Sequence, residues 1–439
     1  MKYDLIVAGG GPAGLMAAKT AAEDGLKVVL LERKKEVTAV NRLCGQFTNI
    51  KMLSVGGKVK YGYVGKLNLE VGTTGVKVHF PDEKFSIDYS GPLRPYINYT
   101  HVSPSGHLVY REKGHIFGFF WEKDSLLRSL IEPAVKAGAE IRTECFCMSA
   151  EDSGREVKVT YRNPSGEGDV IGKRLIIADG KESKLVDSLG WNKKRQIFTN
   201  RVTRAMGYEL EGIDTEIRLN SWVCFTVPSI SLGNFWMYKM PGDRNVLGVT
   251  GFQPEPEERV KKMMAWPAYA GWFKKARLVR KCATAGITSY TPLMEPASGN
   301  VLAIAYSAAM VEVTNPGAVV CGYKGVKAII KEMNGKKGYS DYTKWWKTAF
   351  DTMDPDYMKA AGRFYALNTV CDNDDVDFLY RMIGEQIGVP AVSVARNLDK
   401  VAKDRPALYE KIKKTGIDQS LDKVNIDLGK VMDKPKQGA

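Results

Sequence analysis

Residues 3–32 read YDLIVAGGGPAGLMAAKTAAEDGLKVVLLE, and this stretch decides the fold. Residues 3–8 form a short apolar run typical of a buried strand. A glycine-rich turn follows at once, and the alanine-rich residues 15–24 have the composition of a helix. A second apolar run, residues 27–31, ends at Glu32. The stretch therefore predicts a strand, a turn, a helix and a second strand, which together form a Rossmann-like βαβ unit.

The turn in this unit contains the pattern G-x-G-x-x-G at Gly9, Gly11 and Gly14, and Glu32 stands 18 positions after the last glycine. The first glycine permits a tight turn, the second lets the backbone approach a pyrophosphate, and the third lets the helix lie close to the strand. N–H groups at the start of the helix attract phosphate, and the acidic residue accepts from ribose hydroxyls. A turn of purely structural role would not need the strand, helix and acid in this order. The sequence therefore predicts a dinucleotide site.

The composition is that of a globular protein, with 439 residues of which 44% are hydrophobic and 26% charged. It excludes disordered, collagen-like and disulfide-scaffold proteins. The longest apolar candidate for a membrane span, residues 301–313, is interrupted by three polar residues. The start at Lys2 lacks the pattern of an export signal. We therefore expect a cytoplasmic protein that is at most peripheral to a membrane.

Other motifs that carry chemistry are missing from the sequence. The seven cysteines show no C-x-x-C spacing and the four histidines no H-E-x-x-H spacing, so no metal site is predicted. No Walker-type G-x-x-x-x-G-K and no G-x-S-x-G occur either. Kinase and hydrolase functions are therefore disfavoured.

The net charge of +14 is spread along the whole chain and is not gathered into one run. Such a charge attracts nucleic acid, an anionic membrane surface or an anionic substrate through the same long-range field. We do not expect nucleic acid as a partner. A membrane face, an acidic redox partner and an anionic substrate stay open as explanations.

The middle of the chain changes character twice. Residues 173–178 read as a strand that delivers the chain to Asp179, Gly180 and Ser183. After residue 200, alternating polar and apolar residues predict a long antiparallel sheet. Its expected strands are residues 203–212, 221–227, 234–240 and 245–252.

Taken together, these segments resemble FAD-dependent oxidoreductases of the p-hydroxybenzoate hydroxylase type, and within them the geranylgeranyl reductases. Residues 175–190 are similar to the family segment G-A-D-G-x-x-S-x-x-R-x-x-L-G, with Val186 at the usual arginine. Residues 236–248 resemble the aromatic strand and the P-K-G-D turn of the reductases, and residues 42–45 (R-L-C-G) resemble their Cys-Gly segment. The resemblance covers about residues 1–335.

The resemblance implies an α/β fold, α+β overall, in which a Rossmann-like FAD-binding domain is interleaved with an antiparallel-sheet substrate domain. A helical C-terminal region follows. The expected FAD-binding domain consists of residues 1–75, 105–195 and 295–335. The expected substrate domain consists of residues 76–104 and 196–294, and the helical region of residues 336–439.

The resemblance also implies FAD as the cofactor. Ser307 stands where the family has an aspartate that accepts from the ribityl chain of the flavin, so one charge-assisted hydrogen bond should be weakened. The expected cofactor contacts are Gly9, Gly11, Pro12, Ala13, Gly14, Glu32, Arg33, Arg42, Asp179, Gly180, Ser307 and Gly317.

Cys44 matches the cysteine of the reductases that lies near flavin and substrate, where a thiol donates a proton or shapes the pocket. A small buried filler is the alternative for this residue. The expected substrate pocket contains Phe225, Phe235, Trp236 and Tyr238, although alternation places Phe235 and Trp236 on opposite faces of their strand. For each of these side chains, ordinary sheet core is the competing interpretation.

The function implied by the resemblance is reduction or desaturation of a carbon–carbon bond in an apolar substrate such as an isoprenoid. Its electron donor would be NAD(P)H or a ferredoxin-like protein. An aromatic monooxygenase using NAD(P)H and O₂ is a second hypothesis, because the fold is shared. A non-catalytic or redox-sensing homologue is a third, because the flavin segment at Ser307 is altered.

Overall fold

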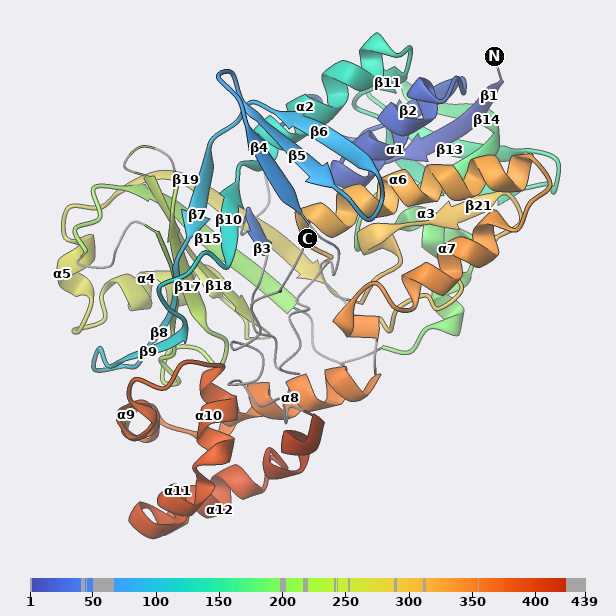
Figure 1. Ribbon diagram of the computed structural model, residues 1–439. Coiled ribbons are helices and arrows are strands. Elements are labelled where there is room, and N and C mark those ends of the chain that lie inside the picture. The colour runs from blue at the N-terminus through green and yellow to red at the C-terminus, as the bar shows by residue number, and fades with distance from the viewer. Residues whose placement is uncertain are drawn as a thin grey trace, which may run out of the picture.

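The computed structural model shows two bodies built on sheets and a group of C-terminal helices (Figure 1). The larger sheets lie at the two sides of the molecule, and the C-terminal helices lie below them in this view. The structure describes residues 2–40, 44, 46–49, 67–197, 203–215, 220–240, 242, 244–251, 253–287, 290–310, 313–353 and 355–423.

The first sheet is centred on β1, whose apolar residues Leu5, Ile6 and Val7 are fully buried. β1 pairs in parallel with β2 on one side and with β14 on the other, which confirms the predicted βαβ unit. The order is β11-β2-β1-β14-β13-β12, and β21 also pairs with β14. The strands are β1 (Tyr3–Ala8), β2 (Val28–Leu31), β11 (Glu140–Arg142), β12 (Phe146–Asp152), β13 (Val157–Asn163), β14 (Gly166–Ile177), β20 (Ala297–Ser298) and β21 (Val301–Ala303).

Two helices pack against each other beside this sheet. They are α1 (Pro12–Glu23) and α6 (Thr314–Met333), and Gly322 sets their close approach. A Cβ at Gly322 would lie 2.3 Å from the carbonyl oxygen of Ala13, well inside van der Waals contact. The neighbouring helices are α2 (Lys123–Lys136), which packs on α1, the short α3 (Lys184–Ser188), and α7 (Gly338–Trp346), which packs on α6.

A small sheet of β4 (Asn68–Val71), β5 (Val76–Phe80) and β6 (Phe85–Tyr89) covers α2 and α6. Phe85 of this sheet stacks on Tyr323 of α6, with ring centroids 4.5 Å apart. Phe80 lies in the same apolar core as the first sheet. The prediction that residues 76–104 belong wholly to the substrate domain is therefore wrong for β5 and β6.

The second large sheet has seven strands in the order β19-β15-β18-β17-β16-β8-β9. It contains all four predicted strands. Its neighbours run antiparallel except β16 and β8, which are parallel. This sheet also contains β9 (Leu108–Glu112), which the expected bounds placed in the FAD-binding domain. The strands are β8 (Asn98–Val102), β9 (Leu108–Glu112), β15 (Thr203–Glu211), β16 (Ser221–Phe225), β17 (Phe235–Lys239), β18 (Arg244–Gly251) and β19 (Arg277–Ile287).

The two faces of this sheet meet different partners. One face packs on α4 (Pro256–Met264) and α5 (Ala270–Phe273) through a core that includes Met237 and Leu247. The opposite face meets a three-stranded sheet of β3 (Phe47–Asn49), β10 (Gly118–Trp121) and β7 (Leu93–Tyr96). This opposite face is the one that borders the candidate site.

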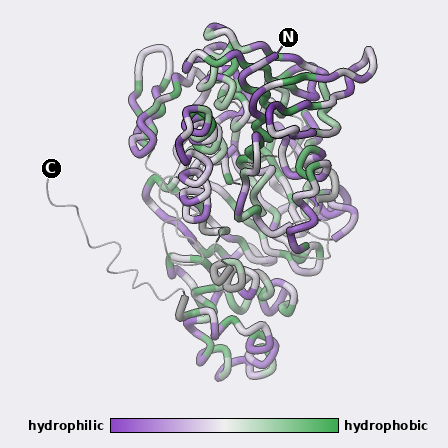
Figure 2. Tube along the Cα trace, turned by 90° about the vertical axis from the view of Figure 1, so that its right-hand side faces the viewer, coloured by the Kyte–Doolittle hydropathy of each residue, from purple (hydrophilic) through white to green (hydrophobic). Residues whose placement is uncertain are grey.

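The C-terminal helices have an apolar core of their own, as the predicted helical region requires. Hydrophilic and hydrophobic residues alternate along them, as in amphipathic helices (Figure 2). Trp346 and Phe350, however, lie in the core of the first sheet, so the predicted boundary at residue 336 falls too early. No helix among the described residues is long and apolar enough to cross a membrane. The remaining helices are α8 (Pro355–Val370), α9 (Asn373–Ile383), α10 (Pro390–Arg396), α11 (Leu398–Asp404) and α12 (Pro406–Lys413).

Candidate functional site

The glycine turn after β1 has the geometry that a pyrophosphate needs. Gly9 has a φ of 104°, and a Cβ there would lie 2.4 Å from the carbonyl oxygen of Ala178. A Cβ at Gly14 would lie 1.8 Å from the carbonyl oxygen of Gly9, whereas a Cβ at Gly11 would meet no described atom within 4 Å. Two glycines are therefore required by the fold, and the third leaves open space at the N-terminus of α1. We call Gly9, Gly11 and Gly14 the glycine cradle.

The start of α1 presents backbone donors to this space. Gly11 is its N-cap and offers no side-chain oxygen, Pro12 occupies the first helical turn, and Ala13 is buried. The N–H groups of the first turn have no partner within the helix. They are therefore available to a phosphate, which the helix dipole also favours.

Glu32 closes the cradle on the side of β2. It is 5% exposed, and its carboxylate accepts from the N–H of Gly10 at 2.5 Å and from the N–H of Lys34 at 2.8 Å. Each carboxylate oxygen has a second lone pair. Glu32 can therefore fix the turn and still accept from a ribose hydroxyl. Arg33 is exposed beside it.

The predicted contacts at residues 179, 180 and 307 lie together. The Ser307 hydroxyl donates to the Asp179 carboxylate at 3.1 Å and accepts from the N–H of Gly180 at 3.0 Å. A hydroxyl oxygen has two lone pairs, so Ser307 can still accept from a ribityl hydroxyl, but without the charge of the usual aspartate. Ser307 stays a predicted cofactor contact, and Asp179 is a carboxylate directly beside it. Burial raises the pKa of Asp179 to about 6, although bonds from Ser183 and Ser307 oppose this.

Lys181 is a part of this region that the sequence did not reveal. It is 7% exposed, and its ammonium donates to the carbonyl oxygens of Ala309 at 2.8 Å and Met310 at 2.6 Å. None of the described carboxylates pairs with it, and burial lowers its pKa to about 7. Lys181 thus fixes the segment that leads into α6, where Gly317 is buried in the first turn. Its partners are backbone atoms, which leave no trace in a sequence pattern.

The Cys44 segment connects the two bodies. The Gln46 side chain accepts from the N–H of Lys123 at the start of α2 at 2.8 Å, and donates to the Tyr238 hydroxyl on β17 at 3.4 Å. Tyr238 in turn donates to the carbonyl oxygen of Cys44 at 2.7 Å. Gln46 has a φ of 47°, which is uncommon outside glycine and is maintained here by these bonds. Cys44 is partly exposed.

Three stacked rings border this segment, and we call Trp222, Trp236 and Tyr238 the aromatic wall. The ring centroids of Trp222 and Tyr238 are 5.1 Å apart with planes 8° from parallel, and those of Trp222 and Trp236 are 5.4 Å apart. Both tryptophans are partly exposed. The wall therefore places apolar rings next to Cys44, with Phe47 packed on Trp222 and Phe120 on Tyr238.

Two of the four predicted pocket residues lie elsewhere. Phe225 and Phe235 are fully buried on the opposite face of the sheet, and the ring of Phe225 packs edge-on against Tyr269 at 5.0 Å. Their assignment to the pocket is wrong, because alternation sends them toward α4 and α5. Trp236 and Tyr238 lie on the other face, where Tyr238 contacts Cys44 and Trp236 stacks on Tyr238. Arg42 lies outside the described residues, and no group of His, Cys, Asp and Glu in the described chain could hold a metal.

The site resembles known flavoproteins at each level of comparison. A family model described as FAD dependent oxidoreductase matches residues 4–51, which contain the glycine cradle and Glu32. Digeranylgeranylglycerophospholipid reductase 2 of Methanopyrus kandleri is 28% identical over 269 residues, 60% of this chain and 58% of that protein. The digeranylgeranylglycerophospholipid reductase of Thermoplasma acidophilum is 27% identical over 248 residues, 56% of this chain and 55% of that one.

Among solved structures, a geranylgeranyl bacteriochlorophyll reductase-like protein from Thermoplasma acidophilum has a TM-score of 0.66 at 18% identity, over 94% of this chain and 99% of the other. The chain is thus similar to FAD-dependent oxidoreductases of geranylgeranyl reductase type. A mutant of the halogenase PltM, solved with FAD, has a TM-score of 0.60 at 14% identity, over 94% and 86% of the two chains. This likeness extends to the fold alone.

FAD is accordingly the cofactor, and the residues of the cradle fit it. The fit rests on the open space at Gly11, the unpaired N–H groups of α1 and the remaining acceptor capacity of Glu32. The chain spans less than two thirds of the length of the two curated relatives named above. Similarity over that part does not fix the substrate.

Proposed function

We propose that the protein reduces carbon–carbon double bonds in an isoprenoid chain. The observation that supports this most directly is the aromatic wall, which lies next to Cys44 on the sheet face that borders the FAD-binding body. The partly exposed tryptophans of this wall suit a hydrocarbon chain, because burying that chain removes apolar area from water. The names of the relatives point to the same substrate class.

When bound, FAD supplies two electrons to the reaction as a hydride equivalent, after a donor has reduced it. Saturating a double bond also requires one proton, which must reach the second carbon. The Cys44 thiol is the described side chain that we assign to this step, since it is partly exposed beside the wall. The donor, NAD(P)H or a ferredoxin-like protein, is thereby oxidised and the substrate is reduced.

Tyr238 positions this thiol and does not itself supply the proton. Burial raises the pKa of Tyr238 well above its ordinary value, and its hydroxyl proton is directed to the Cys44 carbonyl oxygen. Gln46 restrains the same segment from the other side, since its N–H donates to the Cys44 Sγ at 3.4 Å. The two residues therefore hold the cysteine between the aromatic wall and the start of α2.

The experiment is an anaerobic turnover assay on the full chain loaded with FAD. Dithionite reduces the protein, a geranylgeranyl lipid is added, and mass spectrometry records a gain of 2 Da for each saturated double bond. Strict dependence on O₂ with a hydroxylated product would establish the monooxygenase hypothesis instead. A chain that takes up no FAD would establish the non-catalytic one.

The role of Cys44 is tested separately within this assay. If the thiol donates the proton, Cys44→Ala lowers kcat by about 100-fold or more, the usual size of a general-acid contribution. Cys145→Ala is the matched control, because Cys145 is buried at the first sheet and donates to the carbonyl oxygen of Thr143. Equal activities of the two variants would remove Cys44 from the mechanism without removing the reduction.

A further inference from the structure

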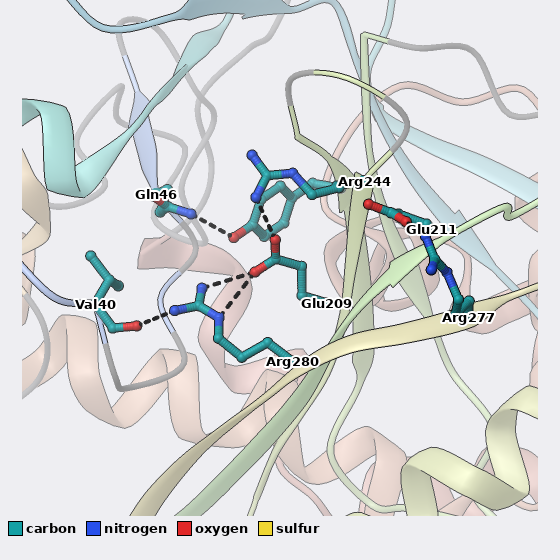
Figure 3. Close-up of polar contacts among 8 residues, drawn as sticks. Val40, Gln46, Glu209, Glu211, Arg244, Arg277 and Arg280 are labelled. Carbon is teal, nitrogen blue, oxygen red and sulfur yellow. Dashed lines mark hydrogen bonds and ion pairs between the residues drawn. The ribbon is translucent and has the colours of Figure 1, made fainter.

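Beside the aromatic wall, the same face of the seven-stranded sheet carries a compact charged group (Figure 3). Glu209 on β15 is 2% exposed and lies between Arg244 of β18 and Arg280 of β19. Its Oε1 accepts from Arg244 Nη1 at 2.7 Å, and its Oε2 accepts from Arg280 Nη2 at 2.9 Å and Nε at 3.1 Å. We call these three residues the arginine pair and its carboxylate.

The strand register shows that this group and the aromatic wall share one face. Val246 pairs with Tyr238 on one side and with Glu209 on the other, and Glu209 pairs with Arg280. Residues directly opposite each other on neighbouring strands project to the same side of a sheet. The face is therefore apolar at β16 and β17 and charged at β18, β15 and β19.

The charged group carries two positive charges and only one negative charge. One arginine balances Glu209, so the second leaves a net charge of about +1. The side chains of Arg244 and Arg280 are 37% and 44% exposed, so their guanidinium groups reach solvent while the carboxylate between them does not. Among the described residues, Arg244 Nε and Nη2 donate to no acceptor, and their geometry suits an anion.

The charges around the pair leave this excess in place. Arg94 donates to the carbonyl oxygen of Met240, at the end of the hairpin that carries Arg244, and adds a positive charge. Glu122 is the carboxyl on the side of α2; burial raises its pKa, and the positive charge of Arg244 opposes this. Glu211 is already paired with Arg277. Apart from the Arg277–Glu211 pair, three described arginines lie near two described carboxylates: Arg94, Arg244 and Arg280 near Glu209 and Glu122.

The charged group is also connected to the Cys44 segment. Arg280 Nη1 donates to the carbonyl oxygen of Val40 at 2.8 Å, four residues before Cys44, and Tyr238 of the wall donates to Cys44 itself. Figure 3 shows Val40 and Gln46 on one side and the arginine pair on the other, with Arg280 bonded to Val40. A ligand with an anionic end at Arg244 and an apolar end at the wall would thus pass Cys44.

We propose that the arginine pair binds the phosphate of an amphipathic substrate whose hydrocarbon chain lies along the aromatic wall. The inference rests on the proposed function for the identity of that chain. The planar guanidinium fork of Arg244 matches two phosphate oxygens, which the point charge of a lysine does not. Glu209 is a positioning residue, because its carboxylate accepts hydrogen bonds from both arginines and fixes their planes.

The test measures binding separately from turnover. The probes are geranylgeranyl phosphate and geranylgeraniol, which share the chain and differ in the anion. Tryptophan fluorescence of the oxidised, FAD-loaded protein reports binding, since two tryptophans form the wall. We expect the phosphate ester to bind at least 10-fold more tightly than the alcohol, and this ratio to fall below 3-fold in Arg244→Gln. Inorganic phosphate should compete only weakly, because it cannot use the wall.

The control is Arg277→Gln, because Arg277 pairs with Glu211 on the same sheet but has a side chain that is 79% exposed. It should leave the ratio unchanged, and Arg244→Lys should restore part of it. Equal loss of affinity for both probes in Arg244→Gln, or no loss for either, would overturn the inference. An arginine-dependent preference without reduction of the chain would retain this binding site and refute the proposed function. Reduction of the chain without any preference for the phosphate ester would retain the proposed function and refute this binding site.

Discussion

Replacing Gly11 by alanine separates what the fold requires from what FAD requires. Gly11 has a φ of −80°, which alanine adopts freely, and its added Cβ would meet no described atom within 4 Å. The free energy of unfolding of the flavin-free protein should therefore change by no more than about 0.5 kcal/mol. The methyl group would, however, occupy the space next to the pyrophosphate. Overpacking of this kind costs about 1–3 kcal/mol, which corresponds to a roughly 5- to 150-fold weaker Kd for FAD.

The assay pairs thermal unfolding of the flavin-free protein, followed by circular dichroism, with a fluorescence titration of FAD. Gly14→Ala is the contrasting variant, because its Cβ would lie 1.8 Å from the Gly9 carbonyl oxygen and should destabilise the protein before any flavin is added. Gly271→Ala in α5 is the neutral control, since its Cβ also meets no described atom within 4 Å. Unchanged FAD affinity in Gly11→Ala, or a clearly lowered melting temperature without flavin, would refute the reasoning.

Three further outcomes follow from the described contacts. The pKa of Lys181 is lowered to about 7 from 10.5, so the unfolded chain binds more protons above pH 7 and this residue makes stability rise with pH. Thermal melts should therefore show that the free energy of unfolding of wild type gains about 2 kcal/mol over that of Lys181→Met between pH 7 and pH 9. A difference that stays constant with pH would contradict the burial of Lys181. Phe235→Ala should lower the free energy of unfolding in urea by about 3–5 kcal/mol yet leave FAD affinity intact. A change in FAD affinity would contradict the placement of Phe235 on the face that packs on α4 and α5. Tyr238→Phe should keep the wall and lower kcat more than it raises KM, because the ring stays while the bonds to Cys44 and Gln46 are lost; the opposite pattern in steady-state kinetics would make Tyr238 a binding residue.

The parts that sequence reasoning predicted are those in which neighbours along the chain act together. The glycine cradle and Glu32 fall within one βαβ unit, so spacing alone places them. Alternation likewise separates Phe235 from Trp236, but it does not say which face meets the cofactor body, and Phe225 and Phe235 were assigned to the wrong one. That choice depends on how the sheets pack.

The arginine pair could not be predicted for a different reason. Glu209, Arg244 and Arg280 lie on three strands far apart in the sequence, and only the register of β15, β18 and β19 brings them together. A shift of one residue on any of these strands would send the side chain to the other face. The same holds for β9, whose place at the sheet edge depends on its pairing with β8.

Under the proposed function, the near-parallel stacking of Trp222, Trp236 and Tyr238 has a consequence for selectivity along the substrate. The stacked rings of the aromatic wall have no feature that repeats with the five-carbon unit of a polyprenyl chain. They therefore bind the chain about equally well wherever it lies along them. Which double bond reaches the flavin must then be decided by whatever fixes one end of the molecule. A chain without an anchored end would slide, and would be saturated at several positions in one encounter. With its end anchored, the protein would measure length and reduce the bond that lies at a set distance from the anchor.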